Sequence, residues 1–251
     1  VLFILTSILM SLAILPVAMT RVSAPKLPKP TRFRIGRLWG ISPTGMTAAT
    51  ASGTIMGAFY ALGALFAQKA GLDVAATSKF MGAAIIGGLV LQYPIGKLSD
   101  RMDRRLVMAG VALLTALICF LMMIESSYSG RGLLVMAMTF GGLSFTLYPL
   151  AVAYTNDYTD VDDIVPMAGG LMMSYGIGAA IGPTIAAPLM DLIGPGGLFA
   201  YIGGITQRAP MPVADQSDYQ AMQRTSAVVY EFYPETENTD QVDDPEDDTR
   251  C

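Results

Sequence analysis

The sequence predicts an all-α polytopic membrane protein, because apolar residues are abundant and are gathered into long blocks. Of its 251 residues, 53% are hydrophobic and only 14% are charged, whereas about a quarter of the residues in a soluble domain are charged. Six blocks approach or exceed the roughly 20 apolar residues that a membrane-spanning helix needs. Only helices or closed barrels satisfy the backbone in lipid, and the alternating pattern of barrel strands is absent from the sequence. We therefore expect every block to be a helix.

The blocks follow one another at residues 1–20, 42–68, 80–96, 106–124, 132–155 and 164–190. The first block lacks the basic start and the small-residue exit of a signal peptide. We interpret it as a true span, and the chain, which opens on Val1, as a fragment of a longer protein. A seventh apolar stretch covers only residues 196–205, about half of a span. We expect a last helix truncated by a deletion, and a re-entrant or surface segment is the alternative.

The segments outside the blocks differ in charge. Residues 21–41 form a basic connection with six Lys or Arg side chains, and residues 42–205 hold the remaining blocks as one helical bundle. Residues 206–251 carry 3 basic and 11 acidic side chains, with several prolines. This last segment has too few apolar residues to form a core, so we predict a disordered acidic tail.

Basic residues in the loops predict the orientation, because Lys and Arg accumulate on the cytoplasmic side of membrane proteins. The 21–41 connection has six of them and residues 97–105 have four, whereas the loops of the opposite side hold Lys69, Lys79 and Arg131. We therefore expect the basic connection and residues 97–105 in the cytoplasm. The acidic link at 156–163 should lie on the same side.

The ten residues "GKLSDRMDRR", 96–105, carry six charges between two apolar blocks, and we call them the hinge. They resemble the loop signature of the major facilitator superfamily (MFS), G-x-L-[AS]-D-[RK]-x-G-R-[RK], which joins helices two and three and, in weaker form, helices eight and nine. The matching residues that define the signature here are Gly96, Asp100, Arg101, Arg104 and Arg105. Asp103 stands where the family has its second glycine, a change that affects the tight turn but leaves the charges in place.

On this resemblance the chain is the carboxy-terminal six-helix half of an MFS transporter fold. Block 1–20 would be helix six, the basic connection would be the long loop between the two halves, and residues 42–205 would hold helices seven to eleven plus a shortened helix twelve. The stretch "GIGAAIGP", 176–183, is similar to the Gly-Pro motif of helix five, at the equivalent place in helix eleven. With "QYPIGKLSDRMDRR" and "LSFTLYPLAVAYTND" it looks like the YcaD-like bacterial branch, which implies a multi-pass protein of the bacterial inner membrane.

In the family, the hinge charges latch the two halves on the inner face in the outward-open state, and the resemblance implies the same role here. Gly96 would let the helix end pack closely against a neighbour. Asp100 would face a helix N-terminus or pair with a nearby arginine. A purely topological anchor, which only keeps the loop in the cytoplasm, is the alternative. We expect the partner helices largely in the missing N-terminal half.

Two motifs place glycines one helical turn apart. Gly53-x-x-x-Gly57 and Gly178-x-x-x-Gly182, followed by Pro183, have the spacing that lets helices approach closely in membranes. We predict helix packing at these positions, and flexing while one half rocks against the other is the alternative.

Polar and aromatic side chains inside the spans are candidates for contact with a substrate or a gate. By resemblance, helices seven, eight, ten and eleven line the central cavity, and the candidates on them are Tyr60, Gln92, Tyr148, Asn156 and Tyr175. Ordinary helix–helix hydrogen bonds or interfacial rings would explain the same residues.

The sequence contains no constellation for enzymatic catalysis. Histidine is absent, neither of the two cysteines has a suitable partner, and no P-loop or G-x-S-x-G is found. We therefore expect no enzyme activity, cofactor, metal site or nucleic-acid partner. The span centres also lack the ionisable residues that usually mark proton relays, so the sequence does not indicate a coupling ion.

We predict transport of a small solute by alternating access, which this half alone should not perform. The expected partners are a small-molecule substrate, the lipid bilayer and the missing N-terminal half. A membrane scaffold that recruits a partner through its acidic tail is the alternative function.

Overall fold

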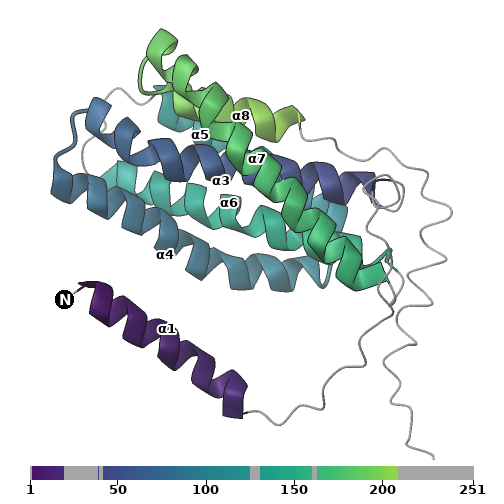
Figure 1. The fold of residues 1–251 in the computed structure, drawn as a ribbon. Coiled ribbons are helices and arrows are strands. Elements are labelled where there is room, and N and C mark those ends of the chain that lie inside the picture. Colours follow the sequence, from purple (N-terminus) through teal and green to yellow (C-terminus); the bar gives the residue numbers. More distant parts are fainter. Residues whose placement is uncertain (1, 20–38, 40–41, 125–130, 160–162, 209–251) are drawn as a thin grey trace, which may run out of the picture. The chain divides into compact units, whose positions relative to one another are not determined.

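The computed structural model describes residues 2–19, 39, 42–124, 131–159 and 163–208, and these ranges contain seven helices and no strand (Figure 1). The all-α prediction is therefore confirmed for the described part of the chain. The chain divides into two compact units, Val1–Phe33 and Arg34–Cys251. The first unit contains helix α1, and the second contains helices α3 to α8.

Helix α1 spans Leu2–Met19, in agreement with the first predicted block. Its described side chains are exposed, with Phe3 and Met10 among the most exposed. One of its few polar groups, the Ser7 hydroxyl, donates to the Phe3 carbonyl at 2.9 Å, within the helix itself. A helix that is apolar on all sides is suited to lipid or a protein interior rather than to water.

The second unit contains five long apolar helices. These are α3 (Pro43–Lys69), α4 (Val74–Ser99), α5 (Arg104–Ile124), α6 (Arg131–Asn156) and α7 (Ile164–Ile193). Each is long and apolar enough to cross a bilayer. Four of the five agree with their predicted blocks to within a few residues.

Helix α4 begins earlier than predicted, at Val74 rather than at residue 80. Asp73 is its N-cap, and the Ala76 N–H donates to the Asp73 carboxylate at 2.7 Å. Such a cap satisfies one of the unpaired N–H groups at a helix start. Thr77, Ser78 and Lys79 lower the hydropathy of the first turns of α4, so the hydropathy pattern alone did not reveal them.

The glycines of the two predicted motifs lie where α3 crosses α7. A Cβ atom on Gly53 or Gly57 would overlap backbone carbonyls of α7, and one on Gly178 or Gly182 would overlap backbone carbonyls of α3. Larger side chains would therefore push the helices apart. Because lipid provides no hydrophobic drive between helices, this close van der Waals contact is what holds them.

Pro183 lies in the same crossing without ending α7. A proline has no N–H to donate to the carbonyl four residues earlier, which here is that of Ala179. That carbonyl faces Gly57 of α3. Contacts between a carbonyl oxygen and a Cα–H group recur at helix–helix interfaces, so the proline and the glycine fit one another.

A second glycine seam lies between α4 and α6. A Cβ atom on Gly87 would overlap the Met138 carbonyl, and one on Gly141 would overlap the Ala84 carbonyl. These glycines belong to adjacent pairs in the sequence, 87–88 and 141–142. They therefore escaped the G-x-x-x-G pattern that predicted the first seam.

Buried phenylalanines join the two helix pairs into one bundle. The ring centroids of Phe59 in α3 and Phe140 in α6 are 5.0 Å apart. Phe199 of α8 meets Phe66 and Phe140 edge-on, at 4.8 and 5.4 Å. All four rings are fully buried, and edge-on contacts are favourable for aromatic rings.

The last helix, α8 (Gly197–Arg208), has 12 residues, about 18 Å of helix, which is roughly half of a bilayer core. The expected short seventh segment is thus a helix. It continues past the predicted boundary at residue 205, because Thr206 is buried and its hydroxyl donates to the Ile202 carbonyl at 2.9 Å. The predicted tail from residue 209 onwards, and the 21–41 connection apart from Trp39, lie outside the described residues.

Candidate functional site

The hinge forms a short connection between the end of α4 at Ser99 and the start of α5 at Arg104. Asp103 caps α5: its carboxylate accepts the Arg105 N–H at 2.8 Å, and its carbonyl accepts the Val107 N–H at 3.1 Å. Aspartate and glycine are both favoured at N-caps. Asp103 therefore preserves the turn at the position where the family signature has glycine.

No described residue packs closely against Gly96, so the close packing expected at this position stays a prediction. A Cβ atom at this position would meet no heavy atom within 4 Å. Gly96 instead lines a pocket between α4 and α6. Within the described part of the chain, glycine here leaves space open rather than bringing two helices together.

Arg104 connects the ends of three helices. As the first residue of α5, it places Nε 2.8 Å from Oδ2 of Asp157, just beyond α6, and Nη2 3.4 Å from Oδ1 of Asp100, the C-cap of α4. The Arg104 and Asp157 side chains are 27% and 32% exposed, so water screens this pair less than a pair on an open surface. The prediction that Asp100 pairs with a nearby arginine is consistent with this geometry, whereas Asp157 was not predicted as a partner.

The two carboxylates share one guanidinium, and this affects the proton affinity of Asp157. Burial raises the pKa of Asp157 above the ordinary value of an aspartic acid, the charge of Arg104 lowers it, and the charge of Asp100 raises it again. Asp157 therefore takes up a proton at a higher pH than a free aspartate does.

Arg105 contacts the same end of α6 through two tyrosines. Its guanidinium carbon lies 5.5 Å from the centroid of the Tyr154 ring and 5.9 Å from that of Tyr158, within the range of cation–π attraction. The two rings are 4.9 Å apart. Neither tyrosine was predicted as a hinge partner. The remaining hinge arginine, Arg101, is exposed.

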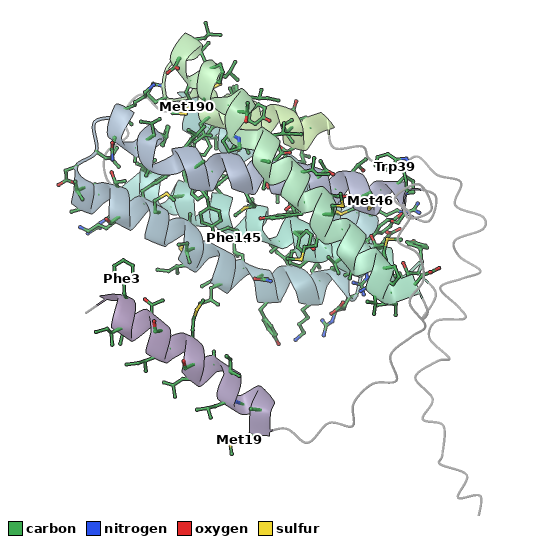
Figure 2. The ribbon with its side chains drawn as sticks, viewed as in Figure 1. Phe3, Met19, Trp39, Met46, Phe145 and Met190 are labelled. Atoms are coloured by element: carbon green, nitrogen blue, oxygen red, sulfur yellow. The ribbon has the colours of Figure 1, made fainter. Side chains whose placement is uncertain are left out.

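Three of the five predicted cavity residues come together, and a fourth ring joins them. Tyr60 of α3 stacks on Phe145 of α6, with centroids 6.0 Å apart and planes at 23°. Tyr148 of α6 meets Tyr175 of α7 edge-on at 4.9 Å, and Phe145 and Tyr148 lie three residues apart, on the same face of α6. We call these four residues the aromatic wall. Figure 2 shows Phe145 near the middle of the bundle's length.

Phe145 was not predicted as part of a site, because an apolar ring inside a span is normally interpreted as packing. Its neighbour Gly88 in α4 gives the only sequence signal. A Cβ atom on Gly88 would overlap the Phe145 ring, so the adjacent glycines of α4 make room for it. This accommodation fixes the ring beneath Tyr60.

The other two predicted cavity residues lie elsewhere. Gln92 lines a pocket of about 150 Å³ between α4 and α6, together with Ser99 and the charged groups of Asp100 and Arg104. Ser99 is 2% exposed, and its hydroxyl has no hydrogen-bond partner within the described ranges. Asn156 is the exposed last residue of α6. Both residues therefore belong to the hinge end rather than to the aromatic wall.

The opposite end of the bundle has a simpler ion pair. Nζ of Lys69, at the end of α3, lies 2.8 Å from Oδ1 of Asp191, near the end of α7. These side chains are 38% and 73% exposed, and exposed pairs stabilise a fold by only about 0–1 kcal/mol. The more extensive charge cluster is therefore at the hinge end.

Five membrane-length helices, a charge cluster at one end and an aromatic surface near mid-length define a multi-pass membrane protein. No group of three or more metal-binding side chains occurs in the described part. The chain belongs to the major facilitator superfamily, whose family model, "Major Facilitator Superfamily", matches residues 41–206. The predicted family and the predicted half-fold are confirmed.

The chain is similar to curated bacterial proteins that are named uncharacterised MFS-type transporters. One from Enterobacter sp. (strain 638) is 31% identical over 201 residues, which cover 77% of this chain and 50% of that protein. One from Yersinia enterocolitica is 29% identical over 70% of this chain and 45% of that protein. YcaD from Escherichia fergusonii is 29% identical over 64% and 41%, respectively, which confirms the resemblance to the YcaD-like branch.

The chain spans about half the length of the curated relatives that it matches. None of the solved structures matches the chain.

Proposed function

We propose that this chain is the carboxy-terminal half of a secondary transporter that moves a small solute across the bacterial inner membrane by alternating access. The observation that carries the proposal is the position of Arg104, which joins the ends of α4, α5 and α6 through Asp100 and Asp157. A connection of this kind can hold the hinge charges in place at one end of this half and can also be broken.

The arrangement of helices supports this assignment. Helix α1 would be family helix six, residues 21–41 the loop between the halves, α3 to α7 helices seven to eleven, and α8 a shortened helix twelve. The hinge end would face the cytoplasm, since the basic loops lie there. Helices one to five would complete the N-terminal half, in keeping with relatives about twice as long.

The hinge charges are suited to a breakable latch because the helix ends do not favour them. Asp100 is at the C-terminal end of α4 and Arg104 at the N-terminal end of α5, and the helix dipole disfavours both signs at these places. The ion pair between Asp100 and Arg104 offsets the unfavourable dipole interaction only while the two helix ends stay together. When they separate, water can solvate the charges, which an apolar seam does not allow.

A topological anchor explains fewer features of the hinge residues than a latch does. An anchor requires only positive charge on the cytoplasmic side, and it leaves the 2.8 Å contact between Arg104 and Asp157 without a role. A latch gives this contact a role, because it would hold the hinge charges in position to face the missing N-terminal half. The aromatic wall would line the solute path, and Gln92 and Asn156 would lie between the wall and the cytoplasm. The crossing of α3 and α7 would be a packed seam that can flex. Its glycines are Gly53, Gly57, Gly178 and Gly182.

The test is uptake of a panel of radiolabelled small solutes into proteoliposomes that contain the full-length protein. We expect Arg104→Glu and Asp157→Arg each to reduce the initial rate about tenfold, equivalent to about 1.4 kcal/mol, and the double variant to recover much of it. Lys97→Glu is the matched control, because it reverses an exposed charge in the same hinge. Equal losses for Lys97→Glu and Arg104→Glu would support the anchor instead.

The scaffold alternative predicts the reverse pattern. Deletion of residues 209–251 would abolish the function of a scaffold, whereas charge reversal at Arg104 would have no effect. Absence of flux for every solute, with correct folding shown, would contradict transport.

A further inference from the structure

The aromatic wall leaves part of its ring surface exposed. Tyr60 is 54% exposed, although it lies near the middle of a membrane-length helix, and Tyr148 and Tyr175 are partly exposed. The stacked pair and the edge-on pair come from three different helices. Their three hydroxyl groups place hydrogen-bond donors and acceptors beside the ring faces.

The wall has no formal charge near it on its own helices. The charged residues of α3, α6 and α7 are Lys69, Arg131 and Asp191, and each lies at or near a helix end. An ion that leaves water needs a partner of opposite charge. The helices α3, α6 and α7, which are described over their full length, offer none at the level of the wall, so these helices compensate neither an anion nor a cation there.

Ring faces also attract cations, which makes a lipophilic cation the main competing occupant. That attraction is smaller than the free-energy cost of removing an ion from water in a protein. A flat ring without charge has no such penalty, and it stacks or packs edge-on against phenol and phenyl rings. A hydrogen-bond acceptor on that ring would also match the tyrosine hydroxyls.

We infer that the aromatic wall (Tyr60, Phe145, Tyr148 and Tyr175) binds an uncharged solute with a flat aromatic ring system and a hydrogen-bond acceptor. This inference rests on the proposed transport function and specifies its substrate class. Phe145 contributes by supporting Tyr60 from below, and the three tyrosines contact the solute.

The test is equilibrium binding to the full-length protein in lipid nanodiscs, with empty nanodiscs as background. The uncharged probes are coumarin, chromone and caffeine, and the comparison probes are tetraphenylphosphonium, naphthalene-2-sulfonate and sorbitol. We expect saturable binding of at least one uncharged aromatic probe. Tyr148→Ala and Tyr175→Ala should each raise its Kd about tenfold, because each removes one ring contact and its burial.

Two further variants separate recognition from general effects. Tyr148→Phe keeps the ring and should change the Kd less than Tyr148→Ala. Phe120→Ala removes an exposed ring from α5, away from the wall, and should leave the Kd unchanged.

The inference is overturned if no uncharged aromatic probe binds, if a charged probe binds with the same dependence on the wall, or if Phe120→Ala weakens binding as much as Tyr148→Ala. It is also overturned if the wall variants lower the melting temperature without affecting any probe, since the wall would then be a contact between the two halves. Uptake measured with the Arg104 and Asp157 variants tests the transport function separately from the substrate class. If charge reversal and its rescue hold while no aromatic probe binds, the substrate class fails and the transport function stands.

Discussion

The crossing of α3 and α7 allows a prediction that compares two glycines of one helix. Alanine at Gly178 should destabilise the protein, whereas alanine at Gly176 should not. A Cβ atom on Gly178 would overlap the Thr50 carbonyl oxygen and lie 2.9 Å from the Thr54 nitrogen, whereas one on Gly176 would meet nothing within 4 Å. The two positions share the same helix and the same change in helix propensity.

The magnitude follows from how far the helices must separate. The overlap with the Thr50 carbonyl oxygen is relieved only if α7 moves away from α3 by about 1 Å, and a gap of that size forfeits roughly half of each contact energy of ~0.1–0.2 kcal/mol. Summed over the atom pairs that face one another in the crossing, the loss is about 1–2 kcal/mol. This agrees with the usual cost of overpacking a core, about 1–3 kcal/mol.

The assay is the apparent melting temperature of the purified protein, followed by circular dichroism. A loss of 1 kcal/mol lowers the melting temperature of a chain of this size by roughly 2–4 °C, so we expect Gly178→Ala to melt about 2–8 °C lower. Gly176→Ala should melt at the same temperature as the wild type or slightly higher. Equal shifts for the two variants would refute the close approach of α3 and α7.

Three further predictions concern the helix ends. Asp103→Ala should reduce the free energy of unfolding by about 1 kcal/mol, and Asp103→Gly by only a few tenths, because glycine is a tolerated N-cap; equal losses in chemical denaturation would argue against the cap. Lys69→Gln should change the free energy of unfolding by about 0.5 kcal/mol or less, because its pair with Asp191 is exposed, and a shift of several degrees in the melting temperature would show that the pair is stronger. The raised pKa of Asp157 means that its ionised form opposes folding above the unfolded-state pKa, and this cost disappears as the pH falls through the folded-state pKa. The melting temperature of the wild type should therefore rise relative to that of Asp157→Asn as the pH is lowered from neutral, and a relative fall would contradict the direction of the pKa shift.

The positions of the helices could be predicted because membrane spans are fixed by local composition. Twenty apolar residues in a row have few alternatives in lipid, so the blocks and the helices agree closely. Where polar residues interrupt the first turns of a helix, as Thr77, Ser78 and Lys79 do in α4, hydropathy does not detect the start, and a single capping side chain decides the boundary. The spacing of Gly53 and Gly57 likewise predicted close packing, because it is a local signal for one helix face.

Partners across the fold could not be predicted, since they depend on which helix ends meet. The hinge signature identified Arg104 and Asp100, but Asp157 and Tyr154 are more than 45 residues further along the chain. At Gly96 the described residues form a pocket, so the close contact that the signature suggested stays a prediction.

The candidate cavity was predicted in part for the same reason. The tyrosines at 60, 148 and 175 were selected because polar rings in apolar spans are conspicuous in the sequence. Phe145 is not conspicuous, and only the stacking on Tyr60 gives it a role. Gln92 and Asn156 were selected on residue type, and their positions along the helices assign them to the hinge end instead.

Alternating access is the central claim, and reciprocal labelling of cysteines on either side of the aromatic wall tests it most directly. In the full-length protein with Cys119 and Cys251 replaced by alanine, Val152→Cys lies on the hinge side of the wall and Ala64→Cys on the opposite side. A membrane-impermeant maleimide is added from the hinge side of the membrane to label position 152 and from the opposite side to label position 64. The account predicts that Arg104→Glu, which breaks the latch, increases labelling at position 152 and decreases labelling at position 64. Parallel changes at both positions, or no change at either, would contradict it.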